Sequence, residues 1–220
     1  MRFPCLVLDH DDTVVNSTAV IHFPSFLAYL KQVRPGLSYT LDDYFRKNFD
    51  PGIIPLFKDE LGFTDEELEG EYRFWQKCVA TRVPKAYPGM REILERYKAC
   101  GGKIAVISHS VGDIIRRDYR ENGLPEPDLI FGWELPPEHR KPNTWPLEQV
   151  MAEFHLAPEQ LLMLDDLKPG YDMCRAAGVP FAAAGWANDI PEIEAYMRQN
   201  CDYYFKTVPA FGEFLARQLL

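Results

Sequence analysis

The sequence is short of basic residues, with 24 Lys and Arg against 33 Asp and Glu and a formal net charge of −9. This balance argues against a general nucleic-acid binder and against a protein held on an anionic membrane surface, because both need a positive face. It leaves room for an anionic small-molecule partner, provided that a metal ion or a well-placed Lys supplies positive charge locally.

Cysteine and long apolar runs are also scarce. The five cysteines show no CxxC spacing, so we expect small buried hydrophobes of a reducing compartment rather than a disulfide framework. No apolar stretch approaches the ~20 residues that span a bilayer, and no cationic leader precedes a cleavable apolar run. We expect a cytoplasmic protein, monomeric or homodimeric, in which 220 residues form one large domain or a domain with an insertion.

Short apolar runs are present instead, and they alternate with helical patterns. The helical patterns end at Gly101, Gly123 and Gly178, as expected for glycine after the last turn of a helix. Alternation of helices with fully apolar strands predicts an α/β fold in which helices cover both faces of a parallel sheet. The expected strands are 2–9, 103–108, 128–133, 161–166, 180–185 and 202–205.

The segment 17–86 differs from the rest because it shows helical spacing without strands. The stretches 17–33 and 63–83 both carry it, and Thr64 with Glu67 forms a capping-box pattern for the second. We therefore expect a helical insertion at 17–86, with residues 1–16 and 87–220 forming the sheet domain.

Polar residues follow three of the expected strands. Asp9 follows the first, Ser108 the second, and Asp165 with Asp166 the fourth, while Lys141 lies in the loop after the third. In an open parallel sheet, ligands bind beyond the carboxyl ends of the strands. Two acidic strand ends at one edge repel each other unless a cation lies between them. Since only oxygen ligands are in view, Mg²⁺ fits best.

These residues fit phosphoryl transfer. The Asp9 carboxylate can attack phosphorus and form an aspartyl-phosphate, and a divalent ion would offset its repulsion from the phosphate. Asp11 can protonate the leaving oxygen and later deprotonate water. Ser108 can donate to a phosphoryl oxygen, and Lys141 can neutralise charge on the transferred group.

Four stretches in order resemble motifs of one family. They are LDHDDT at 8–13, AVISHS at 105–110, RKPNTWPL at 140–147 and LLMLDDLKPGYDMCRAAGV at 161–179. They are similar to the four motifs of the haloacid dehalogenase-like superfamily, in the branch of phosphoglycolate phosphatases and β-phosphoglucomutases. The resemblance implies a three-layer Rossmann-like core, with a helical cap inserted between the first and second motifs.

The resemblance also implies roles for individual residues. Asp9 would be the nucleophile and Asp11 the acid/base. Mg²⁺ would be held by Asp9, Asp166 and the backbone carbonyl of Asp11, with Asp165 a direct or indirect partner. Dehalogenation is not expected, because family members that remove halides lack a carboxylate at the position of Asp11. The side chains implied to organise the phosphoryl group are Thr13, Ser108 and Lys141.

Most of the other polar residues near these motifs are expected to be structural, and His109 is left open. Asp12 should cap the turn or the start of a helix, and His10 should pack away from Asp9 and Asp11. His109 lines a substrate pocket or packs under the cap. Asp172 should be a charge at a helix N-terminus, since the position where many relatives carry a further Asp is Gly170.

The cap should choose the substrate, and its sequence is less informative. Arg46 and Lys47 have the charge to meet an anionic substrate, but a solvated helix face is the preferred interpretation. We expect an Mg²⁺-dependent phosphatase of a small phosphorylated metabolite. A phosphomutase of the same fold, a phospho-receiver switch and an inactive scaffold are the alternatives; motif order disfavours the receiver, and the intact acids disfavour the scaffold.

Overall fold

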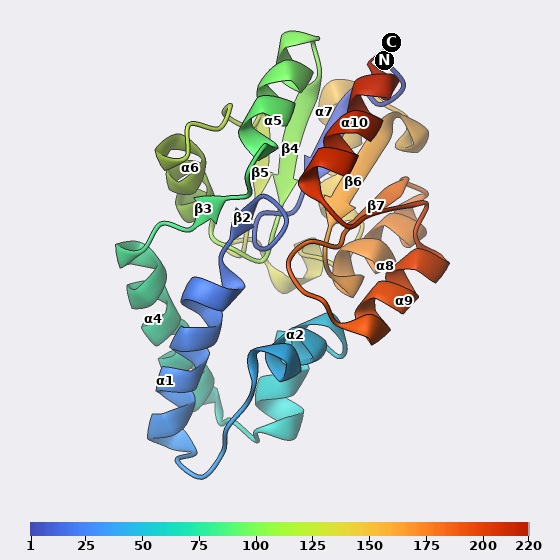
Figure 1. The fold of residues 1–220 in the computed structure, drawn as a ribbon. Coiled ribbons are helices and arrows are strands. Elements are labelled where there is room, and N and C mark those ends of the chain that lie inside the picture. Colours follow the sequence, from blue (N-terminus) through green and yellow to red (C-terminus); the bar gives the residue numbers. More distant parts are fainter. Residues whose placement is uncertain (220) are drawn as a thin grey trace.

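The computed structural model describes residues 1–219 and contains a six-stranded parallel sheet, seen at the centre of the upper part of Figure 1. The expected strands all form. Their bounds lie within two residues of the predicted ranges, except that the first strand begins three residues later than predicted. In sheet order they are β5 (Leu129–Phe131), β4 (Lys103–Ile107), β1 (Cys5–Leu8), β6 (Leu161–Asp165), β7 (Phe181–Ala184) and β8 (Tyr203–Phe205).

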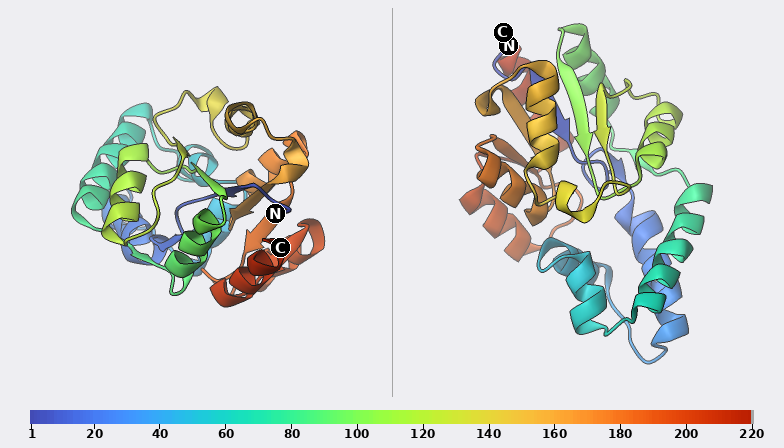
Figure 2. Two further views of the ribbon diagram at one scale, coloured as in Figure 1. Left: turned by 90° about the horizontal axis from the view of Figure 1, so that it is seen from above. Right: turned by 180° about the vertical axis from the view of Figure 1, so that it is seen from behind.

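Helices cover both faces of this sheet, as predicted. In β1, Leu6 and Leu8 belong to one buried cluster, whereas Cys5 and Val7 belong to the other, because successive side chains of a strand point to opposite faces. Figure 2 shows the resulting three layers. The first face is covered by α5 (Met90–Ala99), α6 (Gly112–Glu121) and α10 (Val208–Gln218), and the second by α7 (Trp145–Phe154), α8 (Lys168–Ala177) and α9 (Pro191–Asn200).

The register of the central strands brings their carboxyl ends to one level. Leu8, the last residue of β1, pairs with Val106 of β4 on one side and with Leu164 of β6 on the other. Parallel strands share one direction, so the residues that follow these three positions meet at the same edge of the sheet. This edge faces the lower, helical part of the molecule in Figure 1.

The lower part is a helical cap with its own small core. Thr40 and Thr64 each begin a helix with a complete capping box, as predicted for Thr64. Buried aromatic rings, among them Phe26, Tyr44 and Phe57, fill its interior. The cap contains a π-helical turn (Thr18–His22), α1 (Phe23–Val33), α2 (Leu41–Phe49), α3 (Ile53–Pro55), a second π-helical turn (Leu56–Glu60) and α4 (Asp65–Thr81).

A two-stranded neck joins the two parts. β2 (Val15–Asn16) and β3 (Lys85–Ala86) pair antiparallel, with Val15 opposite Ala86. The sequence did not reveal this pairing, because two residues are too few to show alternation. The division into a sheet domain of 1–16 with 87–220 and a cap of 17–86 stays a prediction. Two 3₁₀ turns complete the described elements, Pro137–His139 and Pro158–Gln160.

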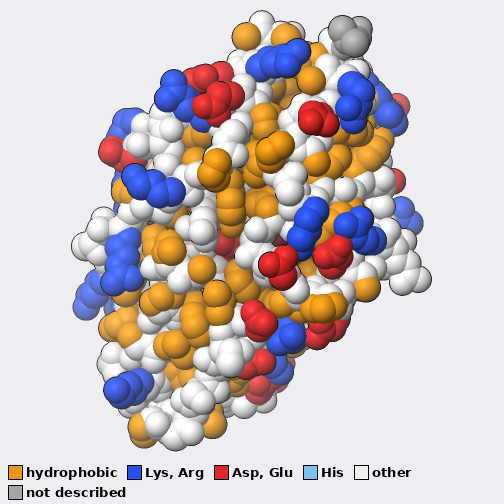
Figure 3. All heavy atoms as spheres, viewed as in Figure 1, with side chains coloured by type: hydrophobic (Ala, Val, Ile, Leu, Met, Phe, Trp, Pro, Cys, Tyr) orange, Lys and Arg blue, Asp and Glu red, His pale blue; other side chains and the backbone are white. Residues whose placement is uncertain are grey.

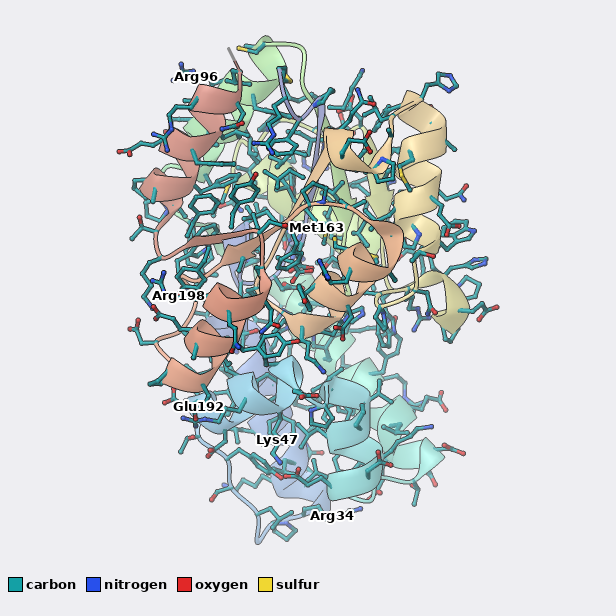
Figure 4. All side chains as sticks on the ribbon, turned by 90° about the vertical axis from the view of Figure 1, so that its right-hand side faces the viewer. Arg34, Lys47, Arg96, Met163, Glu192 and Arg198 are labelled. Atoms are coloured by element: carbon teal, nitrogen blue, oxygen red, sulfur yellow. The ribbon has the colours of Figure 1, made fainter. Side chains whose placement is uncertain are left out.

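The cap also packs against the sheet domain through α2. Phe45 and Phe49 are buried in the same cluster as the residues of α8 and α9. Beside them the Arg46 guanidinium donates to Glu192 of α9 (2.9 Å), and Figure 4 shows Glu192 at this boundary. Lys47 pairs with Glu60 inside the cap. Both basic side chains are therefore engaged at the surface, which agrees with the preferred interpretation of that helix.

The surface and the cysteines largely agree with the expectations from the sequence. On the face drawn in Figure 3, acidic and basic side chains are interspersed among apolar ones. Between residues 1 and 219, no helix is both long and apolar enough to cross a membrane. All five cysteines are free. Cys5 and Cys174 are buried as expected, but Cys100 is exposed, so the expectation of buried cysteines was wrong there.

Candidate active site

The predicted acids and the predicted lysine meet at the carboxyl edge of the sheet. Lys141 donates to the Asp9 Oδ1 atom at 2.7 Å and to the Asp165 Oδ2 atom at 2.8 Å. Asp9, Asp165 and Asp166 each offer a carboxylate oxygen, and these three atoms lie within 4.8 Å of one another. All four side chains are buried. The structure therefore brings together residues that are up to 157 positions apart in the sequence.

The charge of this cluster does not balance. Asp9, Asp165 and Asp166 would carry three negative charges when ionised, against one positive charge on Lys141. Burial raises the pKa of Asp9 to about 7, with Asp165 adding to the rise and Lys141 opposing it. Burial and the neighbouring acids also raise the pKa of Asp166 well above its ordinary value, whereas Asp165 and Asp9 raise the pKa of Lys141 against the effect of its burial. A divalent cation with oxygen ligands fits such a donor set in number, type and charge.

The two neighbouring acids after β6 face different surroundings. Asp165 is fully buried, and its Oδ1 atom accepts from the Leu167 amide (2.9 Å) while its Oδ2 atom holds Lys141. Asp166 lines the cavity beneath the cap, and the Thr13 hydroxyl lies 3.4 Å from its Oδ1 atom. This geometry favours Asp166 as the direct ligand of a cation and Asp165 as the partner that fixes Lys141.

Asp11 points away from that cluster, toward the cap. Its Oδ1 atom lies 2.9 Å from the His22 Nε2 atom, and its Oδ2 atom accepts from the Ser110 hydroxyl at 2.5 Å. Burial alone would raise its pKa, but the interaction with His22 and the hydrogen bond from Ser110 outweigh burial and hold the pKa of Asp11 well below its ordinary range. Asp11 is thus held as an ionised carboxylate that can accept a proton.

His22 is fixed in turn by Trp75 of α4. The Trp75 indole N–H donates to the His22 Nδ1 atom at 2.9 Å. An indole only donates, so Nδ1 is unprotonated and the Nε2 atom carries the proton that faces Asp11. Burial lowers the pKa of His22, but the nearby Asp11 carboxylate raises it by more, so the net shift of the pKa is upward. The hydrogen bond from Trp75 opposes this shift, because it requires an unprotonated Nδ1 and so favours the neutral ring. Two cap residues, His22 and Trp75, therefore complete the surroundings of Asp11.

We expect His22→Phe to lower kcat for an alkyl phosphate by about 10²-fold, within the ~10² to 10⁴ range of acid–base catalysis. With p-nitrophenyl phosphate the loss should be under about tenfold, because nitrophenolate leaves without being protonated. Steady-state kinetics on both esters measures the difference. His139→Phe is the matched control, since His139 stacks on Trp145 and does not line the cavity. An equal loss on both esters would show that His22 is only structural.

Two of the three side chains predicted to organise the phosphoryl group, Ser108 and Lys141, line the cavity, and His109 lines it as well. The Ser108 hydroxyl accepts from the Ser110 amide at 3.2 Å. The His109 Nε2 atom lies 3.2 Å from the Lys141 carbonyl, which fixes the loop of that lysine. Burial and the charge of Lys141 lower the pKa of His109 to about 4, so this ring is neutral near pH 7.

Thr13 is fully buried against Asp166 rather than in the cavity wall, and its role in binding substrate stays a prediction.

Asp12 has the structural role expected of it. Its Oδ1 atom accepts from the Ser17 and Thr18 amides at 3.3 and 3.2 Å, at the start of the first cap helix. Its φ of 57° lies in the left-handed region, which Asp and Asn tolerate better than most residues. Burial raises the pKa of Asp12 to about 6.

His10 packs away from the cavity, as predicted, and ends a buried polar chain. Its Nε2 atom lies 3.2 Å from Asp118, and its ring stacks on Tyr119. Asp118 accepts from Arg117 at 2.6 Å. The same guanidinium donates to the carbonyl of Val79, in the last turn of α4, at 2.7 Å. Side chains of α6 thereby connect the end of the cap with the loop that carries Asp9 and Asp11.

Sequence reasoning missed His22, Trp75 and Ser110. Ser110 could have been found, because it lies two residues after Ser108 and alternation places both on one side of an extended strand end. His22 and Trp75 gave no such signal, since they are 53 residues apart in the cap and neither shows ligand spacing.

The cavity between the cap and the sheet edge has a volume of about 370 Å³. Asp9, Asp11, Lys141 and Asp166 line it at the sheet edge, and further residues of the sheet domain and of the cap complete its walls. A cavity of this size suits a small molecule. Its position over the carboxyl ends of parallel strands is where substrates of open α/β sheets bind.

Comparison with known proteins gives the family. Residues 6–184 match the family model described as haloacid dehalogenase-like hydrolase. The chain belongs to the haloacid dehalogenase-like hydrolases. It is an enzyme of that class, with a helical cap inserted after the first strand.

Its relatives carry different names. A pyrophosphatase PpaX of Halalkalibacterium halodurans is 26% identical over 215 residues, which are 95% of each chain. The crystal structure of a predicted phosphoglycolate phosphatase from Haemophilus somnus superposes with a TM-score of 0.74 at 21% identity, covering 99% of both chains. A hydrolase of the family from Deinococcus radiodurans, with bound phosphate and sodium, superposes with a TM-score of 0.72 at 18% identity over 100% of this chain and 98% of that one. These likenesses support the fold along the whole chain.

Proposed function

We propose that this hydrolase is an Mg²⁺-dependent phosphatase that acts on a small phosphorylated metabolite through an aspartyl-phosphate on Asp9. The observation that carries the proposal is the buried cluster in which Lys141 holds Asp9, 2.7 Å away, beside Asp165 and Asp166. The named phosphatases among its relatives agree with this chemistry.

In the first step the Asp9 carboxylate attacks the phosphorus atom of the ester. A bond forms between Asp9 and phosphorus, and the bond between phosphorus and the alcohol oxygen breaks. Lys141 stabilises the charge of the transferred group, and the Ser108 hydroxyl lies on the cavity wall where it can donate to a phosphoryl oxygen. Asp11 enters this step carrying the proton that it took from water in the second step of the preceding turnover. It delivers this proton to the departing oxygen, so an alcohol leaves and Asp11 becomes a carboxylate.

In the second step water attacks the aspartyl-phosphate. Asp11 accepts a proton from this water, the bond between Asp9 and phosphorus breaks, and phosphate leaves with the Asp9 carboxylate restored. The hydrogen bonds from His22 and Ser110 keep Asp11 in the ionised form that this step requires.

Asp9, Asp166 and the backbone carbonyl of Asp11 are the proposed ligands of Mg²⁺. When bound, the ion offsets the repulsion between the acids and the phosphate and polarises a phosphoryl oxygen. Lys141 and Asp165 keep Asp9 in place meanwhile, because the ammonium group bonds both carboxylates.

We expect chelation with EDTA to lower phosphate release from a panel of phosphomonoesters at least about tenfold, with recovery when Mg²⁺ is added back. Mg²⁺ should also raise the melting temperature of the wild type, because it binds only the folded chain. The shift should be much smaller in Asp166→Asn and unchanged in Asp172→Asn, which alters a half-exposed acid of α8 near Lys168. Full activity in EDTA would refute the metal, and no release from any ester would refute the phosphatase.

A further inference from the structure

The walls of the cavity beyond the reacting groups are aromatic. Tyr44 and Phe45 of α2 and Tyr72 and Trp75 of α4 line them, together with Trp133 from the sheet domain. The rings of Tyr72 and Trp75 stack with their centroids 5.7 Å apart. Such walls exclude water from a leaving group and present ring faces, which attract cations.

These walls lack a free Lys or Arg to pair with an anionic leaving group. Of the residues described, Lys141 is the only Lys or Arg that lines the cavity, and its ammonium is already bound to two acids at the reacting end. Arg140 lies over the Trp133 ring at 4.1 Å and donates to the Leu135 carbonyl, and it does not line the cavity. The second phosphate of pyrophosphate, or the carboxylate of phosphoglycolate, would find no free Lys or Arg side chain among the described residues of this wall.

One acidic residue of the cap, Glu71, belongs to this wall. Glu71 lines the cavity one turn before Trp75 on α4, and no described residue forms a hydrogen bond or ion pair with its carboxylate. Burial raises its pKa to about 7, against the lowering effect of His22, as expected for a carboxyl group that lacks a counter-ion. Glu69, which also lines the cavity, is exposed and paired with Arg73 at 2.5 Å.

We propose that the cavity takes the phosphomonoester of an amino alcohol, with Glu71 as the counter-ion of the ammonium group and the rings of Tyr72 and Trp75 as its walls. This inference rests on the proposed phosphatase function and names its substrate class. A partly buried carboxylate beside aromatic faces attracts an ammonium or quaternary ammonium group both electrostatically and through the rings. The same carboxylate repels a second anionic group.

The test is phosphate release by the full chain with Mg²⁺ on two matched pairs of esters. The pairs are 2-aminoethyl phosphate with propyl phosphate, and choline phosphate with 3,3-dimethylbutyl phosphate, so that each differs chiefly in charge. We expect kcat/KM for the charged ester to exceed that for its neutral partner at least tenfold in one pair or both. Phosphoglycolate and pyrophosphate should be the poorest substrates.

Glu71→Gln should reduce that preference to within about twofold by slowing only the charged esters. The matched control is Glu69→Gln, on the same helix, which should keep the wild-type ratio. Equal rates within both pairs, or a preference for an anionic ester, would overturn the proposal. A uniform loss on all esters in Glu71→Gln would also overturn it, since Glu71 would then act through His22.

Binding of the free alcohols separates this proposal from the phosphatase function. If p-nitrophenyl phosphate and all other esters fail as substrates, the phosphatase is refuted, whereas selectivity of the cavity is still measurable. Choline should then raise the melting temperature of the wild type more than 3,3-dimethylbutanol does, and Glu71→Gln should remove the difference. Equal shifts in the wild type would refute the ammonium site.

Discussion

Asp9→Asn should lower phosphate release at least about 10³-fold, because the amide cannot attack phosphorus as the carboxylate does. The same variant should melt no lower than the wild type in EDTA. Asp9 is buried beside Asp165 and Asp166, and its raised pKa shows that burial and these neighbours disfavour its charge. The amide removes one repelling charge while its oxygen can still accept from Lys141. Kinetics and thermal melting, each measured with and without Mg²⁺, test both halves of this prediction.

Asp12→Asn is the matched control for that variant. It makes the same chemical change three residues away in the same loop, and the amide oxygen can still accept from the Ser17 and Thr18 amides. Activity should stay within about tenfold of the wild type. If Asp9→Asn retained substantial turnover, or if both variants lost activity equally, Asp9 would not be the nucleophile.

Gly170→Ala should abolish most activity and destabilise the fold by about 3 kcal/mol, the sum expected from overpacking and a lost buried hydrogen bond. A Cβ atom at this position would lie 2.0 Å from the Asp165 Oδ2 atom and 2.6 Å from its Cγ atom. Asp165 cannot turn aside without releasing the Leu167 amide or Lys141. Lys141 would then lose one of its two acids. Urea unfolding measures the stability and phosphate release the activity.

Gly36→Ala provides the comparison for a glycine with room around it, since no atom lies within 4 Å of the added Cβ. It should change stability by less than about 0.5 kcal/mol and leave turnover intact. A Gly170→Ala protein as stable and active as the wild type would show that the close approach of α8 to Asp165 is unnecessary.

The sheet and its acidic edge were predictable because their signals are local. Each strand is a short apolar run that ends at a turn or a polar residue, and the order of Asp9, Ser108, Lys141 and Asp166 follows the order of strands. Parallel pairing then places them at one edge by topology alone. Asp12 was correctly set apart as a cap because its short side chain follows the strand at the start of a helix.

The cap side of the site was not predictable, because its contacts join residues that share no periodic pattern. His22 reaches Asp11 from the first helical turn of the cap, and Trp75 reaches His22 from α4. Gly170 is a similar case. The sequence shows a glycine in place of an acid, but only the packing of α8 against Asp165 shows why a side chain does not fit there.

The chain of contacts from Val79 through Arg117 and Asp118 to His10 has a consequence for reading activity screens. Arg117 does not line the cavity, yet it ties the carbonyl end of α4 to the residue between Asp9 and Asp11. A variant substituted at Arg117 would therefore lose activity as an active-site variant does, although the residues that line its cavity are unchanged. In such a screen, proximity to the substrate is a poor guide to which positions tolerate exchange.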